Sequence, residues 1–495
     1  MADNAPIDII RSHQDDLDRE SARQEQKLHP HSPAVEPDEK YERDVPPDGG
    51  YGWVCVACVF WINAHTWGIN SSYGVFLSHY LSHNVFPDTS PLFYAFTGGL
   101  SISCALLVAP LATHFIHKWG TRFVLNLGIF FETLSLIGSS FATLKWHIML
   151  SQGVCFGWGM GFLFVGSVGI APLWFNKRRS VAMGITAAGS GLGGLIYSLA
   201  VGAIIPRYGL GWAFRILGII SCVVNLVCCN LLRDRNKAVG SRFTAFHLPL
   251  LRRPEFLLFL GWGVFSMLGY VALLFSVANF ALSVGLSSHQ GSIVSALLNL
   301  GQGLGRPCVG MFSDRLGRMN IATLLTFLCG LFCLVIWTSA DNMGVVCFFA
   351  ILVGTVSGTY WATVSPVLVE IIGIRDLPSG LSITWITLVS PCTVSEAIAL
   401  QLRSSSGGGT SYLRVQLFTG FMYIGAALCL WLVRGWKVGE IERAQREDAM
   451  PVAPLTKAEK ETTGSVVNTP AEPVQTAQLW SPVSLVRRMV TMKRV

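Results

Sequence analysis

The sequence predicts an all-α membrane protein of twelve transmembrane helices, arranged as two pseudo-symmetric six-helix halves. Three observations predict this fold class. The 495 residues are 51% hydrophobic and only 13% charged, whereas soluble proteins carry about 25% charged residues. Apolar stretches recur along the chain, each close to the roughly 20 residues that cross the hydrocarbon of a bilayer. A polar segment at 233–255 divides these stretches into two sets of nearly equal length.

Each apolar stretch is predicted to be a helix, because backbone polar groups in lipid must be bonded internally. Small residues recur within the stretches, which favours close helix packing in lipid. The expected spans are 53–77, 92–113, 121–142, 146–171, 180–203, 212–232, 256–282, 290–312, 320–338, 343–370, 379–401 and 412–433.

The spans divide the chain into five parts. Both terminal parts are polar, and we expect them to be disordered, the second one mostly so, because they hold too few apolar residues to form a core. The parts are a tail at 1–50, a six-helix half at 51–232, a linker at 233–255, a second six-helix half at 256–433 and a tail at 434–495.

Lys and Arg are concentrated in the loops on one side of the predicted spans, for example in the triplet at 177–179. The positive-inside rule then places both termini and the central linker in the cytoplasm. No apolar segment precedes the first span, so no cleaved signal peptide is expected. The plasma membrane is the expected location, with a vacuolar or other internal membrane as the alternative.

Composition also limits the partners. The formal net charge of +7 does not indicate a nucleic-acid partner, since no nucleic-acid motif accompanies it. The CxxC pair Cys55 and Cys58 lies inside the first span without a second ligand pair, so these residues are expected to be small buried hydrophobes. No cofactor and no metal site is predicted. No ATP-binding P-loop motif occurs, which disfavours a primary pump.

Three motifs resemble those of a known family. They are DGGYGW at 48–53, WFNKRR at 174–179 and GMFSDRLGR at 310–318. The first two resemble the signatures of the monocarboxylate-porter family, and the third resembles the GxxxDRxGR loop of the major facilitator superfamily. The segments at 67–75 and 395–400 are similar to the fungal branch of that family. The resemblance covers residues 48–433 and implies the major facilitator fold, whose two halves rock around a central site.

This resemblance implies a secondary active or facilitative transporter of a small organic solute, working by alternating access. In one version the solute is a monocarboxylate or vitamin-like compound imported with a proton. In the other version a fungal secondary metabolite is exported. Membrane lipid is a further expected partner. A membrane enzyme is not predicted, because neither HExxH nor GxSxG occurs. A non-transporting solute sensor on the same scaffold is the remaining class.

Ionisable residues inside membrane spans are costly and usually face the protein interior. Arg306 is predicted on the eighth span, on one helix face with Asn299 and Gln302. Its planar guanidinium suits a carboxylate, so we predict that these three residues bind substrate. By resemblance, the family has an Asp where Gln302 stands. An amide does not titrate near neutral pH, which predicts weak proton coupling.

Further substrate-binding candidates are the polar and aromatic side chains of the first, tenth and eleventh spans. By resemblance, animal members have a Lys near the position of Ser71, so this cavity is expected to hold one cation rather than several. A larger, partly aromatic or weakly acidic solute is therefore favoured over a very small carboxylate. The candidates are Asn70, Ser71, Tyr360, Trp361 and Trp385, with Trp67, Tyr73 and Tyr270 as further aromatic residues.

The loop after the eighth span holds Asp314, Arg315 and Arg318. The resemblance implies that this loop latches the cytoplasmic side through charge and helix-end contacts. Its predicted role is therefore conformational.

Three other ionisable residues are candidates for gating or proton coupling: His65, Glu132 and Glu396. At 1.5 Å per residue, Arg306 is expected about 24 Å below the outer end of its span and Glu396 about 7 Å below the outer end of its own. A direct ion pair between them is therefore not expected, and Glu396 is expected near an outer gate. A histidine can carry a proton at physiological pH, although a packed neutral ring is the alternative for His65.

Overall fold

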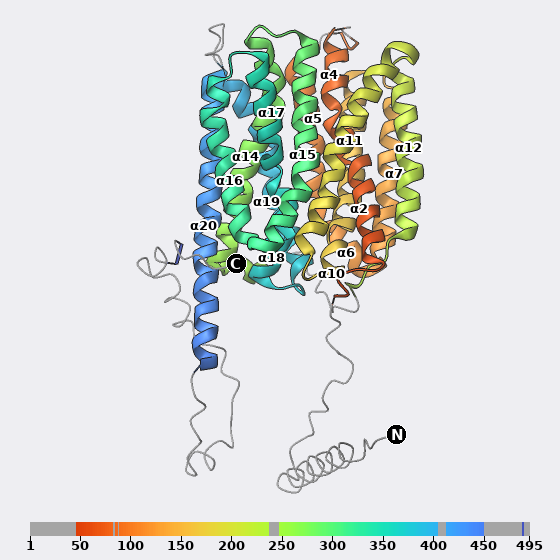
Figure 1. Cartoon of the computed structure of the whole chain (residues 1–495). Coiled ribbons are helices and arrows are strands. Elements are labelled where there is room, and N and C mark those ends of the chain that lie inside the picture. The colour runs from red at the N-terminus through yellow and green to blue at the C-terminus, as the bar shows by residue number, and fades with distance from the viewer. Residues whose placement is uncertain are drawn as a thin grey trace, which may run out of the picture. The chain divides into compact units, whose positions relative to one another are not determined.

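The computed structural model describes residues 46–82, 85–87, 89–236, 247–403, 412–449 and 488–489. Most of the two predicted tails and part of the predicted linker lie outside these residues. In the part of the chain that is described, long helices run alongside one another in a single bundle (Figure 1). We call the end of the bundle where the first helix begins the lower end, as it is oriented in Figure 1.

The first half contains six spans, several of which are built from consecutive helices. They are, in order, α2 (Gly52–His65), α3 (Trp67–Ser71) and α4 (Tyr73–Ser82); α5 (Pro91–Leu107) and α6 (Ala109–Trp119); α7 (Thr121–Ser139); α8 (Lys145–Ile148), a π-helix (Met149–Cys155), α9 (Phe156–Val168) and α10 (Ile170–Trp174); α11 (Arg179–Tyr208); and α12 (Leu210–Leu231).

The second half repeats this plan after a short 3-10 helix (Leu248–Arg252). Its spans are α14 (Pro254–Ser283); α15 (Ser288–Leu316); α16 (Arg318–Val335) with a 3-10 turn (Trp337–Ser339); α17 (Met343–Ser357) and α18 (Thr359–Ile372); α19 (Leu377–Leu402); and α20 (Leu413–Ala449).

Eleven helical segments among the described residues are long and apolar enough to cross a membrane. The remaining predicted span, α15, has 29 residues but is more polar because it carries Asn299, Gln302 and Arg306. It nevertheless lies in the middle of the bundle, parallel to its neighbours (Figure 1). The predicted all-helical fold class is therefore confirmed, and its most polar span is also one of its most central.

The first span is interrupted at Thr66, which has φ −99° and ψ −82°. The Thr66 hydroxyl donates to the carbonyl of Ile62 at 2.7 Å, and this type of back-bonding bends helices. The following short helix α3 begins at Trp67. The bend therefore changes the direction in which the side chains of α3 point, at about the middle of the span.

The two halves meet closely where α11 packs along α15. Glycines make this contact possible, because the partner backbone occupies the place of a side chain. A Cβ on Gly191 would lie 2.6 Å from the backbone nitrogen of Gly303, and one on Gly184 would overlap the carbonyl of Arg306. Small residues are the usual means by which membrane helices approach one another.

The last helix is longer than predicted. The sequence places the end of the twelfth span at 433, but α20 continues to Ala449. The added turns hold three Glu, three Arg and two Ala, which are strong helix formers. The side chain of Trp431 donates to the carbonyl of Met489 at 2.9 Å, so residues 488–489 lie against this helix.

The glycine contact yields a paired prediction. Replacing Gly191 with Leu should lower the thermal stability of the purified protein and abolish solute flux, because the side chain would force α11 away from α15. Gly202 lies on the same helix, where an added Cβ would meet no other atom within 4 Å, so Gly202→Leu is the matched control. Thermal denaturation followed by size-exclusion chromatography measures the stability of both variants, and uptake into proteoliposomes measures their flux. Equal stability and flux of the two variants would contradict the close contact between α11 and α15.

Candidate functional site

A cavity lies between the two halves. Helices of both halves contribute to its wall. The first half contributes Asn63, Trp67, Asn70, Ser71, Ile102, Phe164, Val168, Met183, Thr186, Ala187 and Ser190, and the second half contributes Met267, Tyr270, Val271, Leu274, Arg306, Trp361 and Cys392. The cavity therefore has a mixed wall, in which a few polar groups stand among aromatic and aliphatic side chains.

The guanidinium of Arg306 crosses from α15 to the first half. Its Nη1 donates to the carbonyl of Ala187 at 2.7 Å and to the hydroxyl of Ser190. Its Nη2 donates to Oε1 of Gln302 at 2.6 Å. The Tyr270 hydroxyl also donates to that Oε1, at 2.9 Å. Gln302 thus orients Arg306 from behind, while Ala187 and Ser190 hold its outer edge.

This cation has no carboxylate partner within the described ranges. Arg306 is only 3% exposed, and all of its hydrogen-bond acceptors are neutral oxygens. Its Nε and the Nε2 of Gln302 have no hydrogen-bond partner among the described residues. Burying a charge without an opposite charge is costly, so an anionic group beside Arg306 would offset part of this cost.

Aromatic rings from both halves form one side of the cavity. Trp67 of α3 and Trp361 of α18 lie with ring centroids 5.2 Å apart. Phe164 of α9 packs edge-on against Trp67 at 5.4 Å, and Tyr270 lies 6.4 Å from Trp361. Such rings offer flat apolar surfaces to a ligand. The guanidinium suits a charged group, whereas the rings suit a flat apolar surface. A solute with both features would match this wall.

Polar side chains of the first span complete the wall. Asn63 donates to the carbonyl of Thr186 at 2.9 Å, and Asn70 accepts from the hydroxyl of Ser101 at 2.8 Å. Ser71 donates to the carbonyl of Trp67 at 2.9 Å. Of the predicted substrate-binding residues, Asn70, Ser71, Trp361 and Arg306 therefore line the same cavity.

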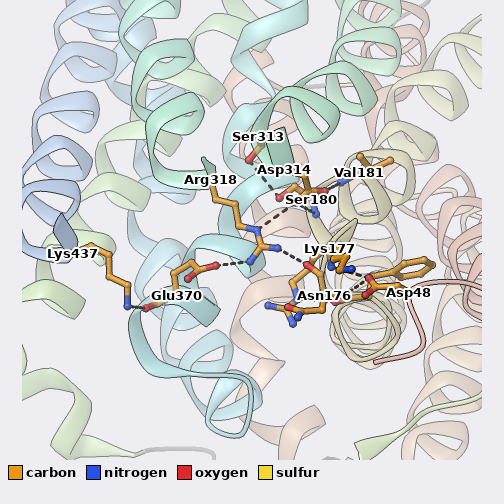
Figure 2. A network of polar contacts seen from close by, with 12 residues as sticks. Asp48, Asn176, Lys177, Ser180, Val181, Ser313, Asp314, Arg318, Glu370 and Lys437 are labelled. Carbon is orange, nitrogen blue, oxygen red and sulfur yellow. Dashed lines mark hydrogen bonds and ion pairs between the residues drawn. The ribbon is translucent and has the colours of Figure 1, made fainter. Parts of the chain in front are cut away.

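At the lower end, polar contacts join the two halves (Figure 2). Asp314, near the end of α15, accepts from the backbone N–H groups of Ser180 at 3.1 Å and Val181 at 2.9 Å. These two residues belong to the first turn of α11, whose N–H groups have no partner within the helix. Asp314 therefore caps a helix of the other half. Its negative charge also interacts favourably with the positive end of the helix dipole.

Arg318, the first residue of α16, lies in the middle of these contacts (Figure 2). Its Nη2 donates to the carbonyl of Asn176 at 2.6 Å, its Nη1 binds Glu370 of α18, and its Nε lies 3.4 Å from Oδ1 of Asp314. We call Asp314, Arg318, Glu370 and their partners on residues 176–181 the latch. Arg315, predicted to belong to it, is exposed and forms no hydrogen bond or ion pair with the described residues.

The profile of the Major Facilitator Superfamily matches residues 54–391. The chain belongs to the major facilitator superfamily. It is 38% identical over 407 residues to "Probable transporter MCH2" of Saccharomyces cerevisiae, which covers 81% of this chain and 86% of that protein. It is 26% identical over 402 residues to the "Fujikurins efflux protein" of Gibberella fujikuroi, which covers 78% of this chain and 83% of that protein.

Solved structures agree with this assignment at the level of the fold. The proton:xylose symporter XylE, bound to 6-bromo-6-deoxy-D-glucose, matches with a TM-score of 0.64 and 14% identity, over 77% of this chain and 95% of that chain. These comparisons confirm the family predicted from the three motifs. The protein is a membrane transporter of a small solute.

Several predicted residues of this transporter lie behind the cavity wall rather than on it. Gln302 contacts Arg306, whereas Asn299 packs beside Gly194 of α11. Tyr360 packs against Trp262 with ring centroids 4.7 Å apart. Trp385 stacks beneath Trp361 at 5.9 Å and lines a second pocket on the lower side. These four positions support the wall without lining the cavity.

The candidate proton carriers lie apart from Arg306. Glu132 of α7 is buried and accepts from Nδ2 of Asn225 on α12 at 2.8 Å. His65 is bonded through Nδ1 to the hydroxyl of Tyr197. Glu396 is half-buried in another pocket, between α5 and α19. These three residues therefore lie outside the central cavity.

Some residues that line the cavity have little signal in the sequence. Ser190 lies in a glycine-rich run that resembles packing sequence only, and Phe164 lies in a continuous apolar stretch. Ala187 contributes through its backbone carbonyl, which no side-chain pattern identifies. The one signal for Ser190 is that it is a polar residue within this glycine-rich run.

The pairing of Glu132 with Asn225 yields a stability prediction. Glu132→Ala should lower the thermal midpoint by several degrees, because it leaves the buried amide of Asn225 without its acceptor. Glu132→Gln keeps an acceptor and should retain both stability and solute flux. Loss of flux in a stable Glu132→Gln transporter would contradict a structural role and identify this residue as a proton carrier.

Proposed function

We propose that this transporter moves an amphipathic organic anion whose flat, partly aromatic body binds against the rings of the cavity. The observation that carries the proposal is Arg306, a buried cation on the cavity wall without a carboxylate partner in the described part of the chain. A bound carboxylate, or a comparable anionic group, would supply the missing charge. Charge-assisted hydrogen bonds from the guanidinium to such a group are among the stronger ones in proteins.

The lining of the cavity favours a solute with a flat apolar body over a very small carboxylate. Aromatic and aliphatic side chains make up most of its wall, as is usual in sites for organic ligands. Trp67 and Trp361 come from different halves and contact each other, so a flat solute against these two rings would contact both halves at once. A ligand in this position is sensed by both halves, which is what alternating access requires.

We propose that the lower end faces the cytoplasm, because Lys177, Arg178 and the other cations near the latch follow the positive-inside rule. In this arrangement the latch closes the cytoplasmic side. Release to the cytoplasm would require Asp314 to leave the first turn of α11 and Arg318 to leave Asn176. The plasma membrane is the location we propose, with both termini in the cytoplasm.

Export is the second version of this function. One relative is named as an efflux protein for fujikurins, and the aromatic wall suits a large metabolite as well as a nutrient. Alternating access is reversible, so the solute gradient sets the direction. A comparison of metabolites inside and outside deletion and wild-type cells would distinguish export from import. Saturable binding without flux in proteoliposomes would instead indicate a solute sensor.

The main prediction concerns Arg306. In proteoliposomes supplied with a panel of radiolabelled aromatic carboxylates, Arg306→Gln should reduce uptake of the transported compound about tenfold or more, because a charged hydrogen-bond donor is lost. Arg306→Lys should keep part of the uptake, since it retains charge but not the planar fork. The uncharged amide of the same compound should be a poor substrate for the unaltered protein.

The matched control is Arg403→Gln. Arg403 is exposed near the end of α19, over the ring of Tyr412 at 5.2 Å, and its loss should leave uptake unchanged. All variants are compared at equal amounts of monodisperse protein. Undiminished uptake by Arg306→Gln would remove Arg306 from the binding site and with it this proposal.

Proton coupling is predicted to be weak, because an amide occupies position 302 and no carboxylate lines the cavity within the described residues. A pH difference of one unit across the proteoliposome should change the initial rate by less than about twofold, whereas a coupled carboxyl group gives a much steeper response. Gln302→Glu should introduce a pH dependence. A steep response of the unaltered protein would contradict the prediction and point to His65, Glu132 or Glu396.

A further inference from the structure

Asp48 lies at the lower end, four residues before α2 begins, and contacts the start of the second motif. Its Oδ1 accepts from the backbone N–H of Asn176 at 2.7 Å and of Lys177 at 2.8 Å. Its own N–H donates to the carbonyl of Trp174 at 3.0 Å. Figure 2 shows Asp48 on the opposite side of this segment from Arg318. Two motifs that are far apart in the sequence therefore form one structural unit.

The backbone of Asp48 is in the left-handed region, with φ +52°. Non-glycine residues rarely adopt this conformation, although Asp and Asn tolerate it best. Such a conformation persists when surrounding contacts hold it. Here the three hydrogen bonds to residues 174–177 supply those contacts. Gly50, two residues later, also has a positive φ of +59°, and together the two residues turn the chain into α2.

The segment that Asp48 holds is also the segment that the second half grips. The carbonyl of Asn176 accepts from Arg318 at 2.6 Å, while the N–H of the same residue is bound by Asp48. Arg318 in turn binds Glu370 and Asp314. Asn176 therefore stands between a carboxylate of the first half and a guanidinium of the second half.

Charge supports the same arrangement. Arg179 is buried beside Arg318, and the two cations repel each other. Three carboxylates face this pair: Glu370, Asp314 and Asp48. Two of them belong to the second half. Asp48 is the one that the first half supplies among these groups, so it contributes to the closed latch both by hydrogen bonding and by charge.

We propose that Asp48 is a positioning residue of the latch: it fixes residues 174–177 so that the Asn176 carbonyl is pre-arranged for Arg318. Its bonds lie within the first half and persist when the halves separate. Their effect is to lower the entropic cost of ordering this segment each time the latch closes. Asp48 thereby favours the state in which the lower end is closed. The proposal rests on the alternating-access mechanism described above.

Two substitutions test this role without straining the backbone. Asp48→Asn keeps the left-handed conformation and one acceptor but removes the charge. Asp48→Gly removes the acceptor and tolerates a positive φ. The full-length protein is reconstituted in lipid nanodiscs without any solute, and backbone hydrogen–deuterium exchange is followed by mass spectrometry. A solute is not needed, so a failure to transport organic anions would leave this test unaffected.

We expect the rate of backbone hydrogen–deuterium exchange to rise at the lower end of the bundle and to fall at the upper end. Residues 174–181 and 313–318 should exchange about tenfold faster in Asp48→Gly, since one hydrogen bond to a charged group changes the population by about that factor. The upper ends of α5 and α19 should exchange more slowly, because opening below closes the bundle above. Asp48→Asn should show a smaller change of the same kind.

The matched control is Asp341→Asn. Asp341 is exposed between α16 and α17 at the upper end and makes no hydrogen bond or ion pair with the described residues, so its loss should alter neither end. Faster exchange confined to residues 174–177 would show that Asp48 merely stabilises its own loop. That result, or unchanged exchange in Asp48→Gly, would overturn the proposal.

Discussion

The buried guanidinium of Arg306 is the interaction on which the rest of this structure depends. The side chain belongs to the second half, but the Ala187 carbonyl and Ser190 hydroxyl that bind its outer edge belong to the first half. A cation at this depth needs compensation, and its acceptors among the described residues are neutral oxygens. Arg306 therefore connects the two halves across the cavity, and an anion at this place is what the proposed function adds.

The helix pair α11 and α15 takes part in three features of the structure: the packing of the two halves, the cavity and the latch. Glycines bring the two backbones together, so that Arg306 reaches Ala187 and Ser190 directly. Further down, Asp314 at the end of α15 caps the beginning of α11. A shift of one helix along the other would therefore change the packing, the cavity and the latch together. Under the proposed function, this common dependence would couple a solute beside Arg306 to the lower end of the bundle.

Much of the fold could be predicted because span length and loop charge are local properties of the sequence. Arg306 stood out for a similar reason, since a charge within an apolar helix is rare. Which neighbours face the cavity was harder to predict. Gln302 lies behind Arg306, and Trp385 lies beneath Trp361, because helix packing decides which face is lined. The role of Asp48 depends on contacts with a distant segment, and the extra turns of α20 depend on helix propensity rather than hydrophobicity.

The most direct test of the account is an experimentally determined structure of the transporter with its solute bound. We predict that an anionic oxygen of the solute lies about 2.8 Å from a guanidinium nitrogen of Arg306, as in other charge-assisted hydrogen bonds. The body of the solute should lie against the rings of Trp67 and Trp361. A solute bound elsewhere, or bound in the cavity with an uncharged group beside Arg306, would contradict the account.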